Sequence, residues 1–130
     1  MPRLLDTHIF IALLEGRSEQ LPASVRQEIQ AKGGALYLSV ASLWEIAIKS
    51  RIGKLPLHTR LHDLPDAARQ AGLILLPINE HHALHTISPE PSTRDPFDRL
   101  LLAQCAIENM RLVTIDRALA DHPLSATAAP

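Results

Sequence analysis

The sequence has few of the residues that build disulfide scaffolds, aromatic platforms or membrane spans. It contains one cysteine, Cys105, and its aromatic residues amount to 3% of 130. A single cysteine excludes a disulfide framework and a thiolate metal cluster, and it favours a reducing cytoplasm. The apolar stretch from Met1 to Leu14 is interrupted by Pro2, Arg3 and Asp6, and no other run approaches the ~20 apolar residues of a membrane span. We therefore expect a soluble cytoplasmic protein that is not exported and contacts no membrane.

The sequence also lacks an excess of either charge. Thirteen Lys and Arg residues balance fourteen Asp and Glu residues, which gives a formal net charge of -1. Nucleic-acid binding would therefore depend on a local basic patch. The hydrophobic share of 46% is sufficient for one core, so we expect a single domain over residues 1–130, with a frayed tail from about residue 123.

Short apolar runs alternate with helical periodicity along the chain. The runs that predict strands cover residues 3–5, 35–39, 73–76 and 111–115. Helical patterns cover residues 9–14, 24–31, 40–53, 61–71, 80–86 and 95–109, and a short helix is expected after Asp116. This alternation predicts a three-layer α/β/α domain around a parallel sheet of four to five strands.

Acidic residues follow several of the expected strands. Asp6 and Asp116 come directly after the first and last strands, Glu45 lies one turn into the helix after the second, and Asp98 begins the helix after the 88–94 loop. Because ligands of parallel α/β sheets gather at the carboxyl ends of the strands, these side chains are candidates for one shared site.

Each acidic residue also has an ordinary structural explanation. Asp6 can cap the helix that follows it, and Asp95 and Asp98 suit the cap and first turn of a helix that begins at Pro96. The pattern Ser42-x-x-Glu45 matches a capping box, and Glu45 can alternatively pair with Lys49. Spacing alone does not decide between these roles and catalysis.

Asp6 is the least satisfactory as a simple cap. Apolar residues precede and follow it, so its carboxylate should be at least partly buried. Burying an unpaired charge costs several kcal/mol, more than the ~1 kcal/mol that a cap contributes. With few cations near the strand ends, a divalent ion is the simplest counter-charge, and carboxylate oxygens favour Mg²⁺ or Mn²⁺. Such a site suits phosphodiester hydrolysis.

Four segments together resemble the PIN domain, and specifically the VapC-type toxins of bacterial toxin–antitoxin modules. They are residues 5–8 (LDTH), 42–49 (SLWEIAIK), 95–101 (DPFDRLL) and 112–116 (LVTID), and the resemblance runs from residue 3 to about 120. It implies an endoribonuclease that depends on Mg²⁺ or Mn²⁺, cleaves structured cellular RNA such as tRNA or rRNA, and leaves 5′-phosphate and 3′-hydroxyl ends.

The resemblance also assigns roles by position. Asp6, Glu45, Asp98 and Asp116 correspond to the catalytic acidic quartet, in which Asp6 and Asp98 are the expected direct metal ligands. Glu45 and Asp116 would act through water, and Asp95 is a less favoured alternative ligand to Asp98. Thr7 and Thr114 match supporting polar neighbours. Related sequences often carry a histidine just before the 95–98 motif, where this chain has Thr93-Arg94.

Partners follow from the same resemblance: a VapB-type antitoxin that blocks the acidic pocket, an RNA substrate, and a homodimer or larger toxin–antitoxin complex. Four cations near the acidic motifs are candidates for binding RNA phosphates: Lys49, Arg94, Arg99 and Arg117. Two alternatives remain open on the residues alone. One is an inactive α/β interaction module, and the other is a metal-dependent nuclease or phosphatase with a different substrate.

Two histidine pairs and the single cysteine are the remaining residues that could bind a metal or take part in catalysis. The pairs His58/His62 and His81/His85 have the i,i+4 spacing of zinc ligands on a helix, but no acidic or cysteine ligand follows at matching spacing, so a solvated surface is favoured. His8 has a structural role or contacts substrate. Cys105 shares a helix face with Leu101, which predicts an inert core position.

Overall fold

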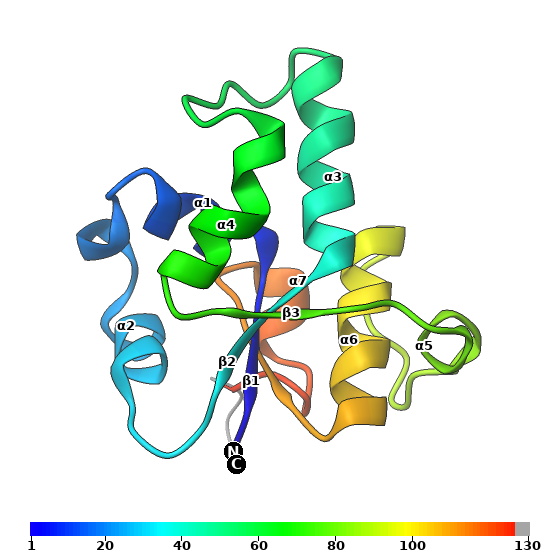
Figure 1. Cartoon of the computed structure of the whole chain (residues 1–130). Helices are drawn as coiled ribbons and strands as arrows, with labels where there is room; N and C mark the ends of the chain where they lie inside the picture. The colour runs from blue at the N-terminus through cyan, green and yellow to red at the C-terminus, as the bar shows by residue number, and fades with distance from the viewer. Residues whose placement is uncertain (127–130) are drawn as a thin grey trace.

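The computed structural model describes residues 1–126 and contains a four-stranded parallel sheet with helices on both faces (Figure 1). The strand order is β3-β2-β1-β4. The strands are β1 (Arg3–Leu5), β2 (Leu36–Ser39), β3 (Ile74–Leu76) and β4 (Arg111–Val113). The expected three-layer α/β/α fold and parallel sheet are confirmed.

Helices follow the strands in the expected order. They are α1 (Thr7–Leu14), α2 (Ala23–Gln30), α3 (Val40–Arg51), α4 (Leu64–Gln70), α5 (Glu80–Leu84), α6 (Pro96–Glu108) and α7 (Arg117–Ala120). The expected helix over residues 61–71 is divided into a 3-10 turn (Leu61–Asp63) and α4, which has a proline in its first turn. A second 3-10 turn (Ser18–Gln20) was not predicted.

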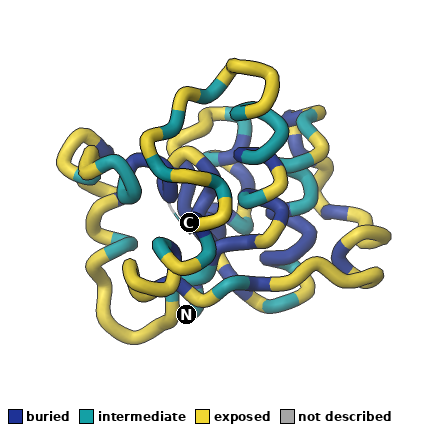
Figure 2. Tube along the Cα trace, turned by 45° about the horizontal axis from the view of Figure 1, so that its top comes forward, coloured by how far each residue is buried: buried dark blue, intermediate teal, exposed yellow. Residues whose placement is uncertain are grey.

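The two faces of the sheet have separate cores because neighbouring strand residues point in opposite directions. Leu5 aligns with Leu38 and Val113, and these three pack with α1, α2 and α4. Leu4 aligns with Leu112 and packs with α6 and α7 on the other face. Figure 2 shows the buried residues concentrated in the centre of the domain.

Burial separates the central strands from the edge. The strand expected over residues 73–76 is present as β3, but Ile74 is 47% exposed because β3 forms an edge of the sheet. Cys105 lies on α6 and is buried in the same core as Leu4 of β1 and Leu112 of β4, as predicted, and burial raises the pKa of its thiol to about 12.

The end of the described chain is held against β4. The Leu112 amide donates to the Leu124 carbonyl at 2.8 Å, and the Ala126 amide donates to the Leu112 carbonyl at 2.8 Å. Residues 124 and 126 are thus bonded to β4 through their backbones. The fraying expected from about residue 123 stays a prediction, and part of it concerns residues 127–130, which lie outside the described residues. Within residues 1–126, no helix has the length and apolar character needed to cross a membrane.

Candidate active site

Asp6 occupies the junction between β1, β4 and the start of α1. Its backbone amide donates to the Val113 carbonyl at 2.9 Å, continuing the pairing of the two strands by one residue. One carboxylate oxygen accepts from the Thr7 amide at 2.7 Å and caps α1, and the other accepts from the Thr114 hydroxyl at 2.7 Å. Asp6 is 3% exposed, so the expected burial is confirmed and its orientation is fixed from two elements.

Thr7 links Asp6 to the acidic residue on α3. Its hydroxyl lies 2.7 Å from Glu45 Oε1 and 2.9 Å from Ser42 Oγ. Since a hydroxyl carries one hydrogen and a carboxylate only accepts, Thr7 donates to Glu45 and accepts from Ser42. Glu45 is buried and its second oxygen accepts from Lys49. Thr7 thereby bridges the two carboxylates: its amide donates to Asp6 and its hydroxyl donates to Glu45.

The capping-box interpretation of Ser42 and Glu45 is wrong. Helix α3 begins at Val40, and Ser39 is its cap, with its hydroxyl accepting from the Ala41 amide at 2.9 Å. Ser42 and Glu45 therefore lie inside the helix, where both side chains face Thr7. The predicted pairing of Glu45 with Lys49 is present.

Asp98 lies in the first turn of α6, where Asp95 serves as the cap. The Asp95 side chain accepts from the Phe97 amide at 2.9 Å. The Thr93 hydroxyl accepts from the Asp95 amide at 3.1 Å and donates to Asp98 at 3.1 Å. Thr93 is 7% exposed, so it fixes the half-buried Asp98 from the preceding loop. This role of Thr93 was not predicted from the sequence, in which the residue is notable only because related chains often carry a histidine nearby.

Asp116 caps α7, and its side chain accepts from the Ala118 amide at 2.9 Å. Its own amide donates to the Thr114 hydroxyl at 3.0 Å, and that hydroxyl donates to Asp6. Asp116 is exposed, unlike Asp6 and Glu45. The Thr114 hydroxyl thus links Asp6, which follows β1, to Asp116, which follows β4.

The charges of these residues act on one another. Burial raises the pKa of Asp6 above its usual value, and the charge of Glu45 contributes in the same direction. The pKa of Asp98 rises to about 7, first because of burial and then because of the negative charges of Asp95, Asp6 and Asp116. The hydrogen bond to Glu45 raises the pKa of Lys49, and the carboxylates of Asp95 and Asp98 add to this effect.

The residues therefore form a region with more carboxylates than cations. Lys49 is bonded to Glu45, and His8, which is exposed, lowers the pKa of Asp6 by its charge. Hard oxygen donors with uncompensated negative charge suit Mg²⁺ or Mn²⁺. Among residues 1–126, however, no three acidic, histidine or cysteine side chains converge tightly enough to hold an ion as they are placed. Direct ligation needs side-chain rotation, whereas binding through ordered water does not.

A cavity of about 270 Å³ opens beside this acidic region. Its lining includes Thr7, His8 and Glu45, together with Lys49 and Lys54. The cavity therefore connects a buried carboxylate with two ammonium groups. This combination can accommodate a phosphate group next to acidic side chains.

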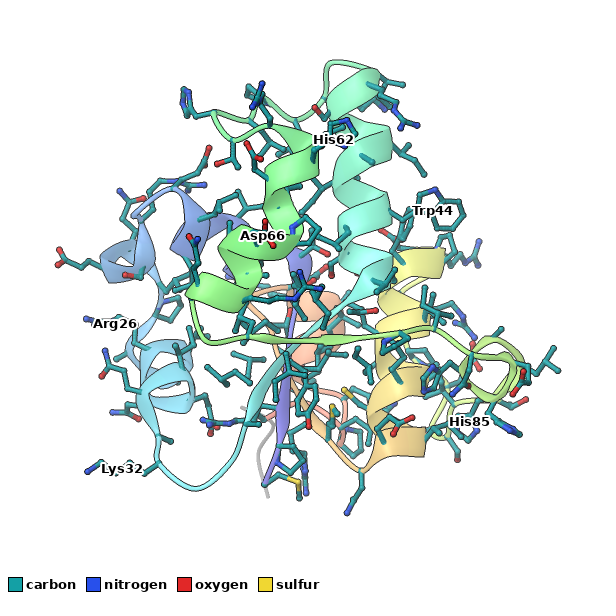
Figure 3. All side chains as sticks on the ribbon, viewed as in Figure 1. Arg26, Lys32, Trp44, His62, Asp66 and His85 are labelled. Carbon is teal, nitrogen blue, oxygen red and sulfur yellow. The ribbon has the colours of Figure 1, made fainter. Side chains whose placement is uncertain are left out.

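The basic candidates differ in how freely they can contact a ligand. Arg99 donates to the Thr93 carbonyl at 3.1 Å and forms an ion pair with Glu90 at 2.7 Å, so it holds the loop before α6. Lys49 is bound to Glu45, whereas Arg94 and Arg117 are exposed. Trp44, labelled on α3 in Figure 3, is 59% exposed. Its ring meets that of Phe97 edge to face, with ring centroids 5.6 Å apart. This aromatic pair was not predicted, because its two members are distant in sequence.

The four histidines considered for zinc are all exposed, which agrees with a solvated surface. Neither pair lies on one helix, since His58 precedes the 3-10 turn that contains His62, and His85 follows the end of α5. His62 and His85 are on separate parts of the surface in Figure 3.

A parallel sheet covered by helices on both faces, with acidic residues placed beyond the carboxyl ends of β1 and β4, defines the class of protein. The chain belongs to the PIN domain family, whose family model matches residues 3–123. It is also similar to Ribonuclease VapC16 of Mycobacterium tuberculosis (strain ATCC 25618 / H37Rv), with 39% identity over 70 residues. That match covers 52% of this chain and 50% of the relative, so the chain spans about half the length of this curated protein. The resemblance to the PIN domain is confirmed, and the similarity to a protein named as a VapC ribonuclease agrees with the rest of that resemblance.

Proposed function

We propose that this protein is a metal-dependent endoribonuclease and the toxin of a type II toxin–antitoxin pair. One observation carries the proposal: buried Asp6 lies within the field of Glu45 and Asp98, and Lys49 is the cation bonded to this group. Such an imbalance of buried charge favours a divalent cation as partner. Membership of the PIN domain family and the similarity to a protein named as a VapC ribonuclease support this activity.

Asp6 and Asp98 are the residues that would hold Mg²⁺ or Mn²⁺, with Glu45 and Asp116 acting through water and Asp95 as the alternative to Asp98. When bound, the ion neutralises charge on the phosphodiester and acidifies a water molecule for attack. Thr7 and Thr114 hold the carboxylates of Glu45 and Asp6 in place through their hydroxyl groups. Thr93 gives the same support to Asp98.

The cavity beside Glu45 is the proposed position of an RNA phosphate next to the acidic residues. Lys49 and Lys54 line it and contribute positive charge. Arg94 and Arg117 extend the contact at the surface, while Arg99 supports the loop. Structured RNA such as tRNA or rRNA is the proposed substrate class. A VapB-type antitoxin in the same cytoplasm would inhibit the enzyme by covering the acidic region, and we propose a homodimer or larger complex as the assembly.

Cleavage of RNA by Asp6→Asn and Asp98→Asn variants tests this proposal. Each substitution keeps the side-chain shape and removes one negative charge, so we expect at least a 100-fold loss of cleavage rate with Mg²⁺ or Mn²⁺ present. Asp66→Asn is the matched control, because Asp66 is exposed on α4, where its side chain pairs with Arg69 (Figure 3). Mapping of the RNA ends should give 5′-phosphates.

Wild-type cleavage rates in both folded variants would refute the assignment. If the wild-type protein cuts DNA or a phosphomonoester but leaves RNA intact, it is a metal-dependent hydrolase with another substrate. If it neither cuts nor binds Mn²⁺, it is an interaction module in which the acids serve as helix caps.

A further inference from the structure

A second polar cavity lies at the opposite ends of the strands from the acidic region. It measures about 340 Å³ and is lined by residues that include Arg3, Glu28, Lys32, Gly33 and Arg111. Arg3 and Arg111 begin the neighbouring strands β1 and β4 and are paired in register. The cavity is therefore built on the amino ends of two central strands, whereas Asp6 and Thr114 follow their carboxyl ends.

Arg3 is the unusual residue of this cavity. It is 4% exposed, although it carries a permanent positive charge. Its Nη2 donates to the carbonyls of Ala31 and Gly34, at 3.2 and 3.0 Å. Its Nε and Nη1 are buried and have no hydrogen-bond acceptor in the described part of the chain. Buried N–H donors of this kind almost always have a partner, so an acceptor is expected in the cavity.

Glu28 does not supply that acceptor. Its carboxylate lies 3.8 Å from Arg3 Nη1, which is close enough for an ion pair but too long for a hydrogen bond. Lys32 and Arg111 add two exposed cations, so positively charged side chains outnumber the single carboxylate in the lining. The balance of charge at this cavity is opposite to that of the acidic region.

The backbone around Arg3 is specifically shaped. Gly33 has φ +98°, a conformation that favours glycine, and a Cβ on Gly34 would overlap the Met1 carbonyl. The two glycines therefore allow the loop after α2 to approach the beginning of β1, where the Gly34 carbonyl receives the Arg3 guanidinium. Figure 3 shows Lys32 on this loop, away from the labelled Trp44 and His62.

We propose that this cavity binds a phosphate group through the free Nε and Nη1 donors of Arg3, with Lys32 and Arg111 at its entrance. An oxyanion supplies acceptors for the unpartnered donors, and the negative charge of a phosphate group, as a monoester or a diester, offsets the excess of positive charge. The source is either a small phosphate compound or the backbone of RNA. The proposal does not depend on nuclease activity, because it uses none of the acidic residues.

Titration of the metal-free protein with inorganic phosphate, followed by NMR of the Arg3 Nε–H group, tests the site. EDTA and constant ionic strength remove contributions from bound metal and from general screening. We expect a saturable shift of the Arg3 Nε–H signal. The double variant Lys32→Gln/Arg111→Gln should bind at least tenfold more weakly, because it removes two positive charges from the cavity entrance. Both residues are exposed, and the one side-chain hydrogen bond that they form within the described chain, from Arg111 Nη1 to the Pro123 carbonyl at 2.8 Å, lies at the surface and outside the core. Arg26→Gln, an exposed arginine of α2 outside the cavity lining, should retain affinity within twofold.

Two further titrations identify the source of the phosphate. Binding of adenosine 5′-monophosphate with the affinity of inorganic phosphate supports a small ligand. Much tighter binding of a 2′-O-methyl RNA oligonucleotide, with the same Arg3 shift, supports the RNA backbone. An Arg3 signal that moves with none of the three, or equal weakening by Arg26→Gln and the double variant, would overturn the proposal and leave water as the occupant. Arg3→Met checks the assignment, since a folded variant should lose saturable binding.

Discussion

Asp98 illustrates how a single residue can be held in an unfavourable charge state. It is half-buried, the carboxylates of Asp95, Asp6 and Asp116 act on it, and these effects raise its pKa to about 7. The Thr93 hydroxyl favours the charged form but does not compensate for burial and repulsion. In the absence of metal, ionisation of Asp98 therefore opposes folding near neutral pH.

The sign of the pH effect follows from the raised pKa. Between pH 4 and 7 the folded protein retains a proton on Asp98 that the unfolded chain releases. Protonation of Asp98 therefore stabilises the folded state fully below pH 4, and this stabilisation is lost as the pH rises to about 7. We expect Asp98→Asn to be more stable than the wild type above pH 7, by about 1–2 kcal/mol after allowance for solvent screening. Urea unfolding at several pH values with EDTA measures the difference. An advantage that does not change with pH would contradict this explanation.

At the scale of elements, α5 shows a short helix stabilised from outside. It has five residues, too few for an isolated helix to be stable. The side-chain oxygen of Asn79 accepts from the backbone amide of His82 at 3.0 Å, and the backbone amide of Asn79 donates to His82 Nδ1 at 3.1 Å. Since Nδ1 accepts, the ring hydrogen is on Nε2, which donates to Glu108 of α6 at 2.8 Å. His82 thus caps α5 and connects it to α6.

Replacement of His82 by alanine should therefore destabilise the protein. The substitution removes half of a capping box and a buried hydrogen bond to a carboxylate, so we expect a loss of about 2–3 kcal/mol in the free energy of unfolding. His81→Ala is the matched control, since His81 is exposed on the same helix and should change stability by less than about 0.5 kcal/mol. Chemical denaturation measures both. Equal losses would show that His82 contributes no more than a surface histidine.

The order of the elements was predictable from local pattern. The strands at residues 3–5, 36–39, 74–76 and 111–113 agree with the apolar runs, and the helices between them follow the expected periodicity. The start of α3 at residue 40 was predicted correctly, whereas the capping box of Ser42 and Glu45 was not, because Ser39 and Ser42 are both suitable caps and only the end of β2 determines which is used. His82 was overlooked because its partner Glu108 is 26 residues away.

The whole molecule has carboxylates at one end of its sheet and a cationic cavity at the other. A divalent ion at the acidic end would bind the folded state alone, since these carboxylates are far apart in the unfolded chain. At 100 times its dissociation constant, such an ion adds about 2.7 kcal/mol to stability. We therefore expect Mn²⁺ to raise the Tm by on the order of 5–10 °C.

Thermal melts with Mn²⁺ or EDTA measure this shift. The double variant Asp6→Asn/Asp98→Asn should lose it, whereas Asp63→Asn/Asp66→Asn, which removes the same charge from an exposed surface, should keep it. An unchanged Tm for the wild type at millimolar Mn²⁺ would argue against a metal at the acidic end.

The sequence by itself determined the alternation of strands and helices, the family, and the burial of Asp6, because periodicity and flanking apolar residues are local properties. Tertiary structure decided which polar groups meet. The hydrogen bonds of Thr7 with Glu45 and of Thr114 with Asp6 join residues 38 and 108 positions apart. Likewise, the unpartnered donors of Arg3 exist only because the sheet buries the guanidinium at its amino edge. Such contacts depend on which chain segments the fold brings together, and the local sequence pattern does not determine this.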